Sequence, residues 1–239
     1  MKRRHLGLLA ALTAILLTGT RSTAQASTLL VDHFDQDSVL NKDVWTDHSV
    51  LLRALAKASS TPPSSFVVPR LGFGDGTGAE MSGPTAEFQT TGLQSLSAFA
   101  PPFQVTIDVS AMEGTANPFE VLLVSDNLRQ YVTVTANVNP LYIGMYGDAP
   151  NIAASTDLGR QFRPRIQPEF GTLYEIVIVI DARGVAAATA KDASGAVLGT
   201  VSHMKAGKGP FYLVLGQRIG LAQPAPQVAE WKNVEVVAH

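Results

Sequence analysis

The chain has 239 residues, of which 16% are charged and 46% are hydrophobic, and it contains no cysteine. This composition excludes an intrinsically disordered protein, which would be rich in charge and poor in apolar residues. The lack of cysteine excludes a disulfide-stapled miniprotein and a cysteine-ligated zinc or iron–sulfur protein. Composition therefore indicates a globular protein but no particular reaction.

The N-terminus has the features of a cleavable export signal. A Lys-Arg-Arg triplet at residues 2–4 precedes an apolar run over Leu6–Leu17, and an Ala-Gln-Ala sequence follows at 24–26. The run is shorter than the roughly 20 residues of a membrane-spanning helix, so an uncleaved anchor is the less favoured alternative. We expect a signal peptide over 1–26, a single domain over 27–239 and a secreted or periplasmic location. The export route stays open.

The mature chain would be mildly acidic. Removal of residues 1–26 leaves 213 residues with 14 basic and 20 acidic side chains, a net charge of −6. A nucleic-acid partner is therefore not expected, because such binding needs a basic face. No second apolar segment is long enough to span a membrane. A domain of this size buries about 70% of its unfolded surface, so it can be stable without disulfides.

Short strands are expected from one end of the mature chain to the other. β-Branched and aromatic runs alternate with Gly, Pro, Asn and Asp, and no long run has a helical period. The expected strands are Leu29–Phe34, Ser49–Leu55, Phe66–Leu71, Ala79–Ser82, Glu87–Gln94, Phe103–Val109, Phe119–Val124, Tyr131–Val138, Leu141–Met145, Tyr174–Ile180, Val185–Lys191, Val197–His203, Phe211–Leu215 and Val228–Val237. Many short strands with regular turn signals predict an all-β sandwich or barrel.

Three details refine this prediction. The segment Tyr174–Ile180 is apolar on nearly both faces, which is typical of a central buried strand. The sequences over Asp181–Gly184 and Asp192–Gly195 predict hairpin turns with a left-handed glycine. The proline- and glycine-containing stretch 139–171 is a long connection, and such connections are often functional loops.

Several segments stand in a characteristic order along the chain. They are Asp32, Phe34, Leu40 and Trp45 near the mature start, the stretch Glu87–Ser95 with the strand after it, the hairpin with turns at Gly184 and Gly195, and the last two strands. Their order resembles that of the concanavalin A-like jelly rolls, and among them the laminarinase-like glycoside hydrolases. The resemblance implies one jelly-roll β-sandwich of two antiparallel sheets and a function related to glycans. It also implies that Trp45 and Trp231 lie in the core.

The resemblance does not extend to the catalytic acids. These enzymes carry Glu-x-Asp-x-x-Glu, or a shorter variant, on one strand, where alternation places the acids on the concave face. Retaining hydrolysis needs two carboxyl groups about 5 Å apart. The corresponding strand here has Tyr131, Thr133 and Thr135 at its outward positions. No catalytic residue is therefore assigned. The calcium ligand of the family's final strand is not matched either, because that stretch reads Trp231-Lys232-Asn233.

A calcium site and a glycan site remain as candidates. Asp32, Asp35 and Asp37 are dense enough to supply oxygen ligands for a structural Ca²⁺, although a solvated acidic loop would look the same. No other cofactor is expected. The candidate glycan-binding residues are Arg129, Tyr131, Tyr142 and Tyr146, because aromatic rings stack on sugars and polar groups hold their hydroxyls.

Three functions are compatible with these observations. The favoured one is a secreted, lectin-like protein that binds a polysaccharide or glycan without the glucanase dyad. A glycoside hydrolase or polysaccharide lyase with a non-standard site is the first alternative, and a structural or adhesive exported protein is the second. Function inferred from fold is analogy only, so the site must decide.

Overall fold

The computed structural model describes residues 26–34, 39–58, 65–73, 78–83, 89–114, 118–138, 141–146, 160–219 and 226–239. Apart from Ala26, the predicted signal peptide lies outside these residues. The strands are β1 (Thr28–Asp32), β2 (Trp45–Thr46), β3 (Ser65–Phe66), β4 (Arg70–Gly72), β5 (Ala79–Ser82), β6 (Gln89–Phe99), β7 (Phe103–Glu113), β8 (Glu120–Val124), β9 (Tyr131–Val138), β10 (Leu141–Tyr146), β11 (Arg160–Gln161), β12 (Leu173–Ile180), β13 (Val185–Asp192), β14 (Val197–Lys205), β15 (Phe211–Ile219) and β16 (Val228–Ala238), and the helix is α1 (Val50–Ala58).

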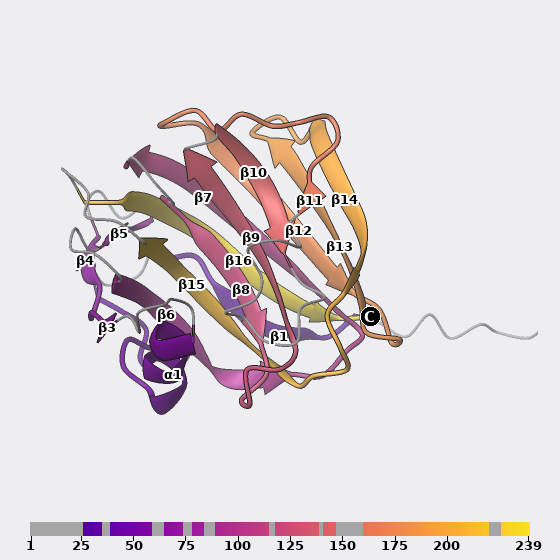
Figure 1. The fold of residues 1–239 in the computed structure, drawn as a ribbon, viewed down its shortest axis with the longest axis horizontal. Coiled ribbons are helices and arrows are strands. Elements are labelled where there is room, and N and C mark those ends of the chain that lie inside the picture. Colours follow the sequence, from indigo (N-terminus) through magenta and orange to yellow (C-terminus); the bar gives the residue numbers. More distant parts are fainter. Residues whose placement is uncertain are drawn as a thin grey trace, which may run out of the picture.

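The strands form two sheets that stack as a sandwich (Figure 1). The first sheet has the order β14-β13-β12-β7-β16-β5-β4, with β1 also paired to β16. The second has the order β11-β10-β9-β8-β15-β6-β2, with β3 also paired to β6. Among the strands that the structure describes, every named pairing is antiparallel except the short β3–β6 pair. The predicted β-sandwich of two antiparallel sheets is confirmed.

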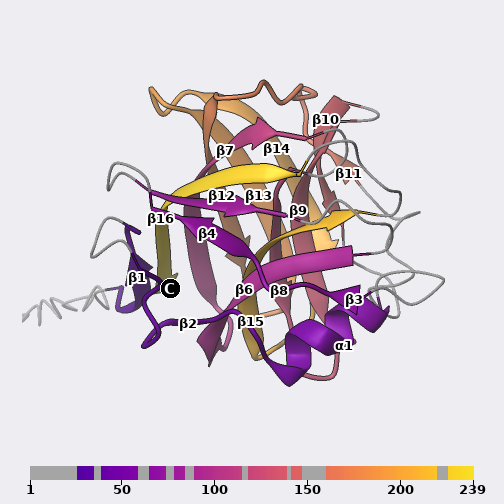
Figure 2. The ribbon, with the colours of Figure 1, turned by 90° about the vertical axis from the view of Figure 1, so that its left-hand side faces the viewer.

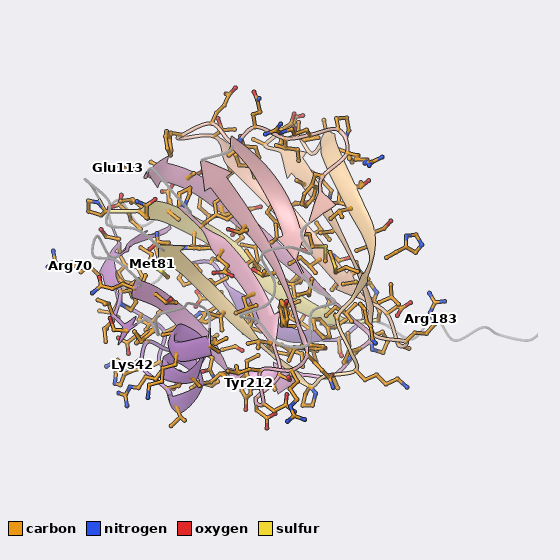
Figure 3. The ribbon with its side chains drawn as sticks, viewed as in Figure 1. Lys42, Arg70, Met81, Glu113, Arg183 and Tyr212 are labelled. Atoms are coloured by element: carbon orange, nitrogen blue, oxygen red, sulfur yellow. The ribbon has the colours of Figure 1, made fainter. Side chains whose placement is uncertain are left out.

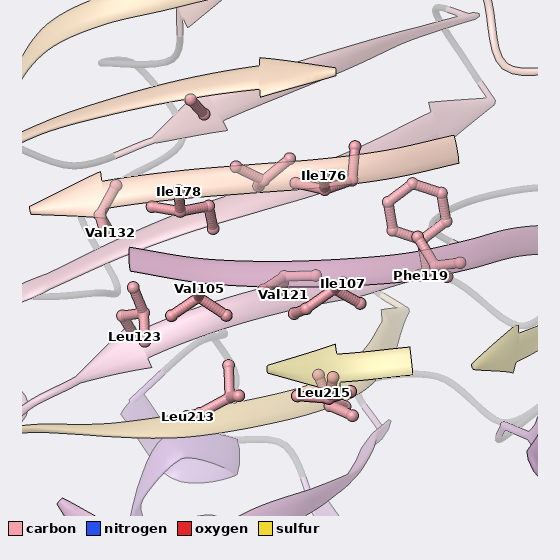
Figure 4. Packing of buried hydrophobic residues seen from close by; sticks show 14 of the residues in the cluster. Val105, Ile107, Phe119, Val121, Leu123, Val132, Ile176, Ile178, Leu213 and Leu215 are labelled. Carbon is pink, nitrogen blue, oxygen red and sulfur yellow. The ribbon is translucent and has the colours of Figure 1, made fainter. Parts of the chain in front are cut away.

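The main core lies between the facing sides of the two sheets. Alternation along β7 and β12 places Val105, Ile107, Ile176 and Ile178 on the inner side of the first sheet, where all four are fully buried. The second sheet meets them with alternate apolar residues of β8, β9 and β15 (Figure 4). Trp45 and Trp231 both belong to this core, as the resemblance implied.

The expected strand over Ser49–Leu55 is wrong, because most of this segment forms α1. The period of the burial decides the structure: Leu52, Leu55 and Ala56 are buried, which is the i, i+3, i+4 spacing of one helical face. Ser49 caps the helix, since its hydroxyl oxygen accepts a hydrogen bond from Leu52 N at 3.0 Å. The two-residue strands β2 and β11 are not predicted from the sequence.

The strand β12 lies centrally in its sheet, between β13 and β7, as expected, but only one of its faces is fully buried. Ile176, Ile178 and Ile180 point into the core, whereas Val177 and Val179 on the other face are half-buried. The outer face of the first sheet therefore reaches solvent, and valine at these positions reflects strand propensity more than burial.

Both predicted hairpin turns are present. Gly184 and Gly195 have φ angles of 80° and 83°, which is the left-handed region that the turns require. In the first turn, the Asp181 carboxylate accepts hydrogen bonds from the backbone N–H of Val185 and of Arg183, both at 2.9 Å. The Val185 bond, followed by the Arg183 side chain, holds the pKa of Asp181 below its ordinary value.

Replacement of Gly184 by alanine is expected to destabilise the protein more than the same change at Gly195. The two glycines have nearly equal φ, so each change incurs about 1–2 kcal/mol of backbone strain. A Cβ at Gly184 would also lie 2.3 Å from the carbonyl oxygen of Gly207, whereas a Cβ at Gly195 meets nothing within 4 Å. Equilibrium denaturation of both variants measures the difference, and equal losses would contradict the steric account.

Candidate functional site

The outer face of the second sheet is where the resemblance places a sugar-binding surface, and α1 covers one half of it. The helix residues Leu52 and Leu55 pack with Leu122, Tyr131 and Val214 into a second, smaller hydrophobic cluster. These sheet residues occupy outward positions of β8, β9 and β15. Figure 2 shows α1 on the outside of the sandwich, next to β3. We call this region the apolar half of the face.

The other half of the same face is polar. We call it the polar floor and define it by Gly92, Glu120, Thr133, Thr135 and Gly216. The backbone register places Gly92 opposite Gly216, Gly216 opposite Glu120, and Glu120 opposite Thr135, so these four residues form a row across β6, β15, β8 and β9. Thr133 lies one outward position further along β9.

A carboxylate and a hydroxyl are in contact on the polar floor. Thr133 Oγ1 lies 3.0 Å from Glu120 Oε1 and also 3.0 Å from the carbonyl oxygen of Val121, and Thr135 Oγ1 donates to the carbonyl oxygen of Phe119 at 3.1 Å. The side chains are well buried, since Glu120 is 6%, Thr133 3% and Thr135 6% exposed. The floor therefore holds a carboxyl group and two hydroxyl groups in fixed positions.

Glu120 is not among the site residues predicted from the sequence. It is the single acid among the described residues of the second sheet's strands, and it lies one strand away from the position where the resemblance places the catalytic acids. One signal could have found it: Glu120 interrupts the apolar run Phe119–Val124, and an acid within such a run is rarely buried without a role.

The four candidate glycan-binding residues do not form one described site. Arg129 is exposed in the β8–β9 turn, where its backbone N–H donates to Asn127 Oδ1 at 3.0 Å. Tyr131 is only 2% exposed because α1 covers it, so its ring does not offer the expected surface for sugar stacking. Tyr142 and Tyr146 lie on β10, but their side chains are outside what the structure describes.

Of the three candidate calcium ligands, Asp32 is the one that the structure describes, and it has a structural role. Its Oδ2 accepts a hydrogen bond from Trp45 Nε1 at 2.7 Å, and its Oδ1 accepts one from Phe34 N at 2.8 Å. Asp35 and Asp37 lie outside the described residues. Within the part of the chain that the structure describes, no group of three or more His, Cys, Asp or Glu side chains could hold a metal ion. The calcium site stays a prediction, which melting with and without Ca²⁺ would test.

Asp32→Ala is expected to lower the free energy of unfolding by about 1–3 kcal/mol. The change leaves the buried indole N–H of Trp45 without its acceptor, and an unpaired buried polar group incurs about this penalty. Asp43→Ala is the matched control, because Asp43 is an exposed acid of the same region. Urea denaturation measures both, and similar losses in the two variants would contradict the assigned role of Asp32.

Comparisons with known proteins found similarity in structure but not in sequence. No family model matches the sequence, and no curated protein matches it significantly. A non-specific endo-β-1,3(4)-glucanase of family GH16 superposes with a TM-score of 0.65 at 10% identity, covering 90% of this chain and 91% of the enzyme. β-Agarase A from Zobellia galactanivorans gives 0.62 at 9% identity, covering 90% and 92%.

A third structure is similar over almost its whole length. It is an immunostimulatory antigen and pseudo β-1,3-glucanase of Mycobacterium tuberculosis, with a TM-score of 0.60 at 10% identity over 89% of this chain and 99% of that one. The fold is the concanavalin A-like jelly roll of the GH16 structures. At these identities the similarity establishes the jelly roll and not an activity.

The described strands of the second sheet do not hold the pair of carboxyl groups that hydrolysis uses. The outward positions Tyr131, Thr133 and Thr135 hold no carboxylate, and Glu120 has no second acid beside it on the described strands of this sheet. Hydrolysis with retention of configuration uses two carboxyl groups about 5 Å apart, and hydrolysis with inversion uses two that lie about 6.5–9.5 Å apart.

Among the described helices, none is long and apolar enough to cross a membrane.

Proposed function

We propose that this protein is an exported, non-catalytic glycan-binding jelly roll. The observation that carries the proposal is the outward composition of β9, which is Tyr131, Thr133 and Thr135 where a glucanase of this fold would carry its acids. Threonine hydroxyls are not basic enough to take the place of a catalytic carboxylate pair, so the chemistry of retaining or inverting hydrolysis has no support on this strand.

The fold favours a glycan as ligand. The similar structures include one described as a transglycosylase in complex with NAG and one described as β-agarase A in complex with oligoagarose. By analogy we place the ligand of the present chain on the outer face of the second sheet, at the polar floor and on the β10 side of it. The signal-like N-terminus supports export to a compartment where polysaccharides occur.

Affinity measurements on the purified protein test the proposal. Titration calorimetry with soluble neutral and anionic polysaccharides should detect binding to at least one of them. Each protein molecule should occupy one binding site on the polysaccharide chain. Thr135→Val, a nearly isosteric change on the polar floor, should weaken that binding, while Thr189→Val on the outer face of the first sheet should not. Failure to bind any polysaccharide would contradict the proposal.

A structural or adhesive protein without a sugar site is the second candidate, and one observation favours it. The apolar half of the outer face is filled by α1, whose Leu52 and Leu55 bury the side chains on which a ligand would otherwise lie. Under this alternative the polar floor serves only stability, so Thr135→Val would change the unfolding free energy and no polysaccharide would bind.

A further inference from the structure

The exposed side of α1 is positively charged, although the mature chain would have a net charge of −6. Arg53 and Lys57 are exposed on this helix, and they are its only ionisable residues. Leu52 and Leu55 pack on the second sheet, so the cations lie on the side of the helix that faces solvent. The helix therefore covers the apolar half of the outer face and gives it a basic exterior.

The turn between β8 and β9 places a third cation next to α1. Leu128 packs against the hydrophobic cluster beneath the helix, and the exposed Arg129 follows it in the chain. The turn is closed by hydrogen bonds, because Gln130 N donates to Ser125 Oγ at 3.1 Å and Ser125 N donates to the carbonyl oxygen of Gln130 at 2.8 Å. The backbone of Arg129 is therefore held close to the helix.

The loop between β14 and β15 adds a fourth cation. Gly209 N donates a hydrogen bond to Gln130 Oε1 at 2.9 Å, which joins this loop to the β8–β9 turn. Lys208 precedes Gly209 and is exposed. We call the four cations the basic surface, and they are Arg53, Lys57, Arg129 and Lys208.

The charge of the basic surface is only partly compensated. Within the described part of the chain, none of its four side chains forms an ion pair. The adjoining segments contain two acids, Asp126 in the turn and Asp47 shortly before α1, and Asp47 is paired with His48. A local excess of positive charge attracts anionic partners, even when the net charge of the whole protein is negative.

We infer that the basic surface binds the anionic groups of a polysaccharide, which are uronate carboxylates or sulfates. This inference rests on the proposed function, and it adds the charge of the glycan and a second contact area beside the polar floor. Arg53 and Arg129 can each form two parallel hydrogen bonds to a carboxylate or a sulfate. The two lysines contribute compact positive charges that attract the same groups.

An anionic lipid surface fits the basic surface less well. A helix that lies on a membrane buries its own apolar side among the lipids. The apolar side of α1 is already packed on the second sheet, and Val50 is the one large apolar side chain that the helix exposes. The helix therefore offers charge to a partner but no apolar side for insertion.

The test compares the wild type with the double variant Arg53→Gln/Arg129→Gln by titration calorimetry. Polygalacturonate and dextran sulfate are the anionic probes, one for each anionic group, and dextran and laminarin are the neutral probes. The wild type should bind at least one anionic probe, and added salt should weaken that binding. The double variant should bind the same probe about 3- to 30-fold more weakly, and its binding of neutral probes should not change.

A matched control removes two positive charges elsewhere. Arg70→Gln/Arg163→Gln changes an exposed residue of β4 at the edge of the first sheet (Figure 3) and an exposed residue whose backbone is bonded to Thr200 of β14. This variant should keep the affinity of the wild type for the anionic probe. All four substituted side chains are exposed, so both double variants should fold, and melting curves verify this.

The outcomes distinguish this inference from the proposed function. A wild type that binds neutral probes but no anionic probe overturns the inference and leaves the proposed function intact. Equal losses of affinity in the two double variants also overturn only the inference, because binding would then depend on net charge and not on the basic surface. A wild type that binds vesicles of anionic phospholipid but no polysaccharide contradicts both.

Discussion

Leu52→Ala is expected to lower the free energy of unfolding by about 2–5 kcal/mol, the range for a leucine truncated in a packed interior. Leu52 is 1% exposed and joins α1 to Leu122, Val124 and Tyr131 of the second sheet. Loss of its side chain leaves a cavity beneath a helix of only nine residues, which has little stability of its own. Chemical denaturation measures the loss.

Val50→Ala is the control for Leu52→Ala. Val50 begins the same helix but is 84% exposed, so its replacement should change stability by no more than about 0.5 kcal/mol, and the better helix propensity of alanine favours a small gain. An equally small effect of Leu52→Ala would show that α1 is not part of the packed structure, and the outer face of the second sheet would then have to be reconsidered.

Trp231→Ala should have the largest effect of any single change considered for this protein, a loss of about 3–5 kcal/mol. Trp231 is fully buried on β16 and contacts the ring of Phe119 edge-on, with the ring centroids 6.3 Å apart. It joins the two sheets, because β16 belongs to the first and Phe119 directly precedes β8 of the second. Thermal and chemical denaturation both report this loss.

The two tryptophans should respond differently to replacement by phenylalanine. Trp45→Phe removes an indole N–H that donates to Asp32 at 2.7 Å, and bonds to charged groups contribute about 1.5–3 kcal/mol. Trp231 Nε1 is buried with no hydrogen-bond partner among the described residues, so Trp231→Phe removes an unsatisfied donor and should be the milder change. The opposite order would contradict this assignment of the two indoles.

Most of the fold could be predicted from the sequence because local patterns and tertiary structure agree in it. Alternation in Phe103–Val109 and in Tyr131–Val138, and the turn chemistry ending at Gly184 and Gly195, correspond directly to β7, β9 and the two hairpins. The strand expected over Ser49–Leu55 is wrong because the leucines of this segment fit a short strand and a helix equally well. Only the position of the sheet beneath the segment shows that its leucines are buried with the spacing of a helix and not with that of a strand.

The candidate site was less predictable because it depends on contacts between distant segments. Outward orientation of Tyr131 follows from alternation, but its burial follows from α1, which lies some 75 residues earlier in the chain. The same holds for Asp32: its spacing suggests a calcium loop, and its bond to Trp45 shows a structural role. Glu120 was overlooked because the resemblance directed attention to β9.

The most direct test of the account is a turnover assay of the purified protein on the polysaccharides that it binds. New reducing ends and unsaturated products are followed together, with and without Ca²⁺, beside an active glucanase of the same fold as a positive control. We predict bound polysaccharide and no product above the buffer background. Product formation that is lost in Glu120→Gln would show an enzyme with a non-standard site, and would contradict the claim that the outer face of the second sheet binds without catalysis.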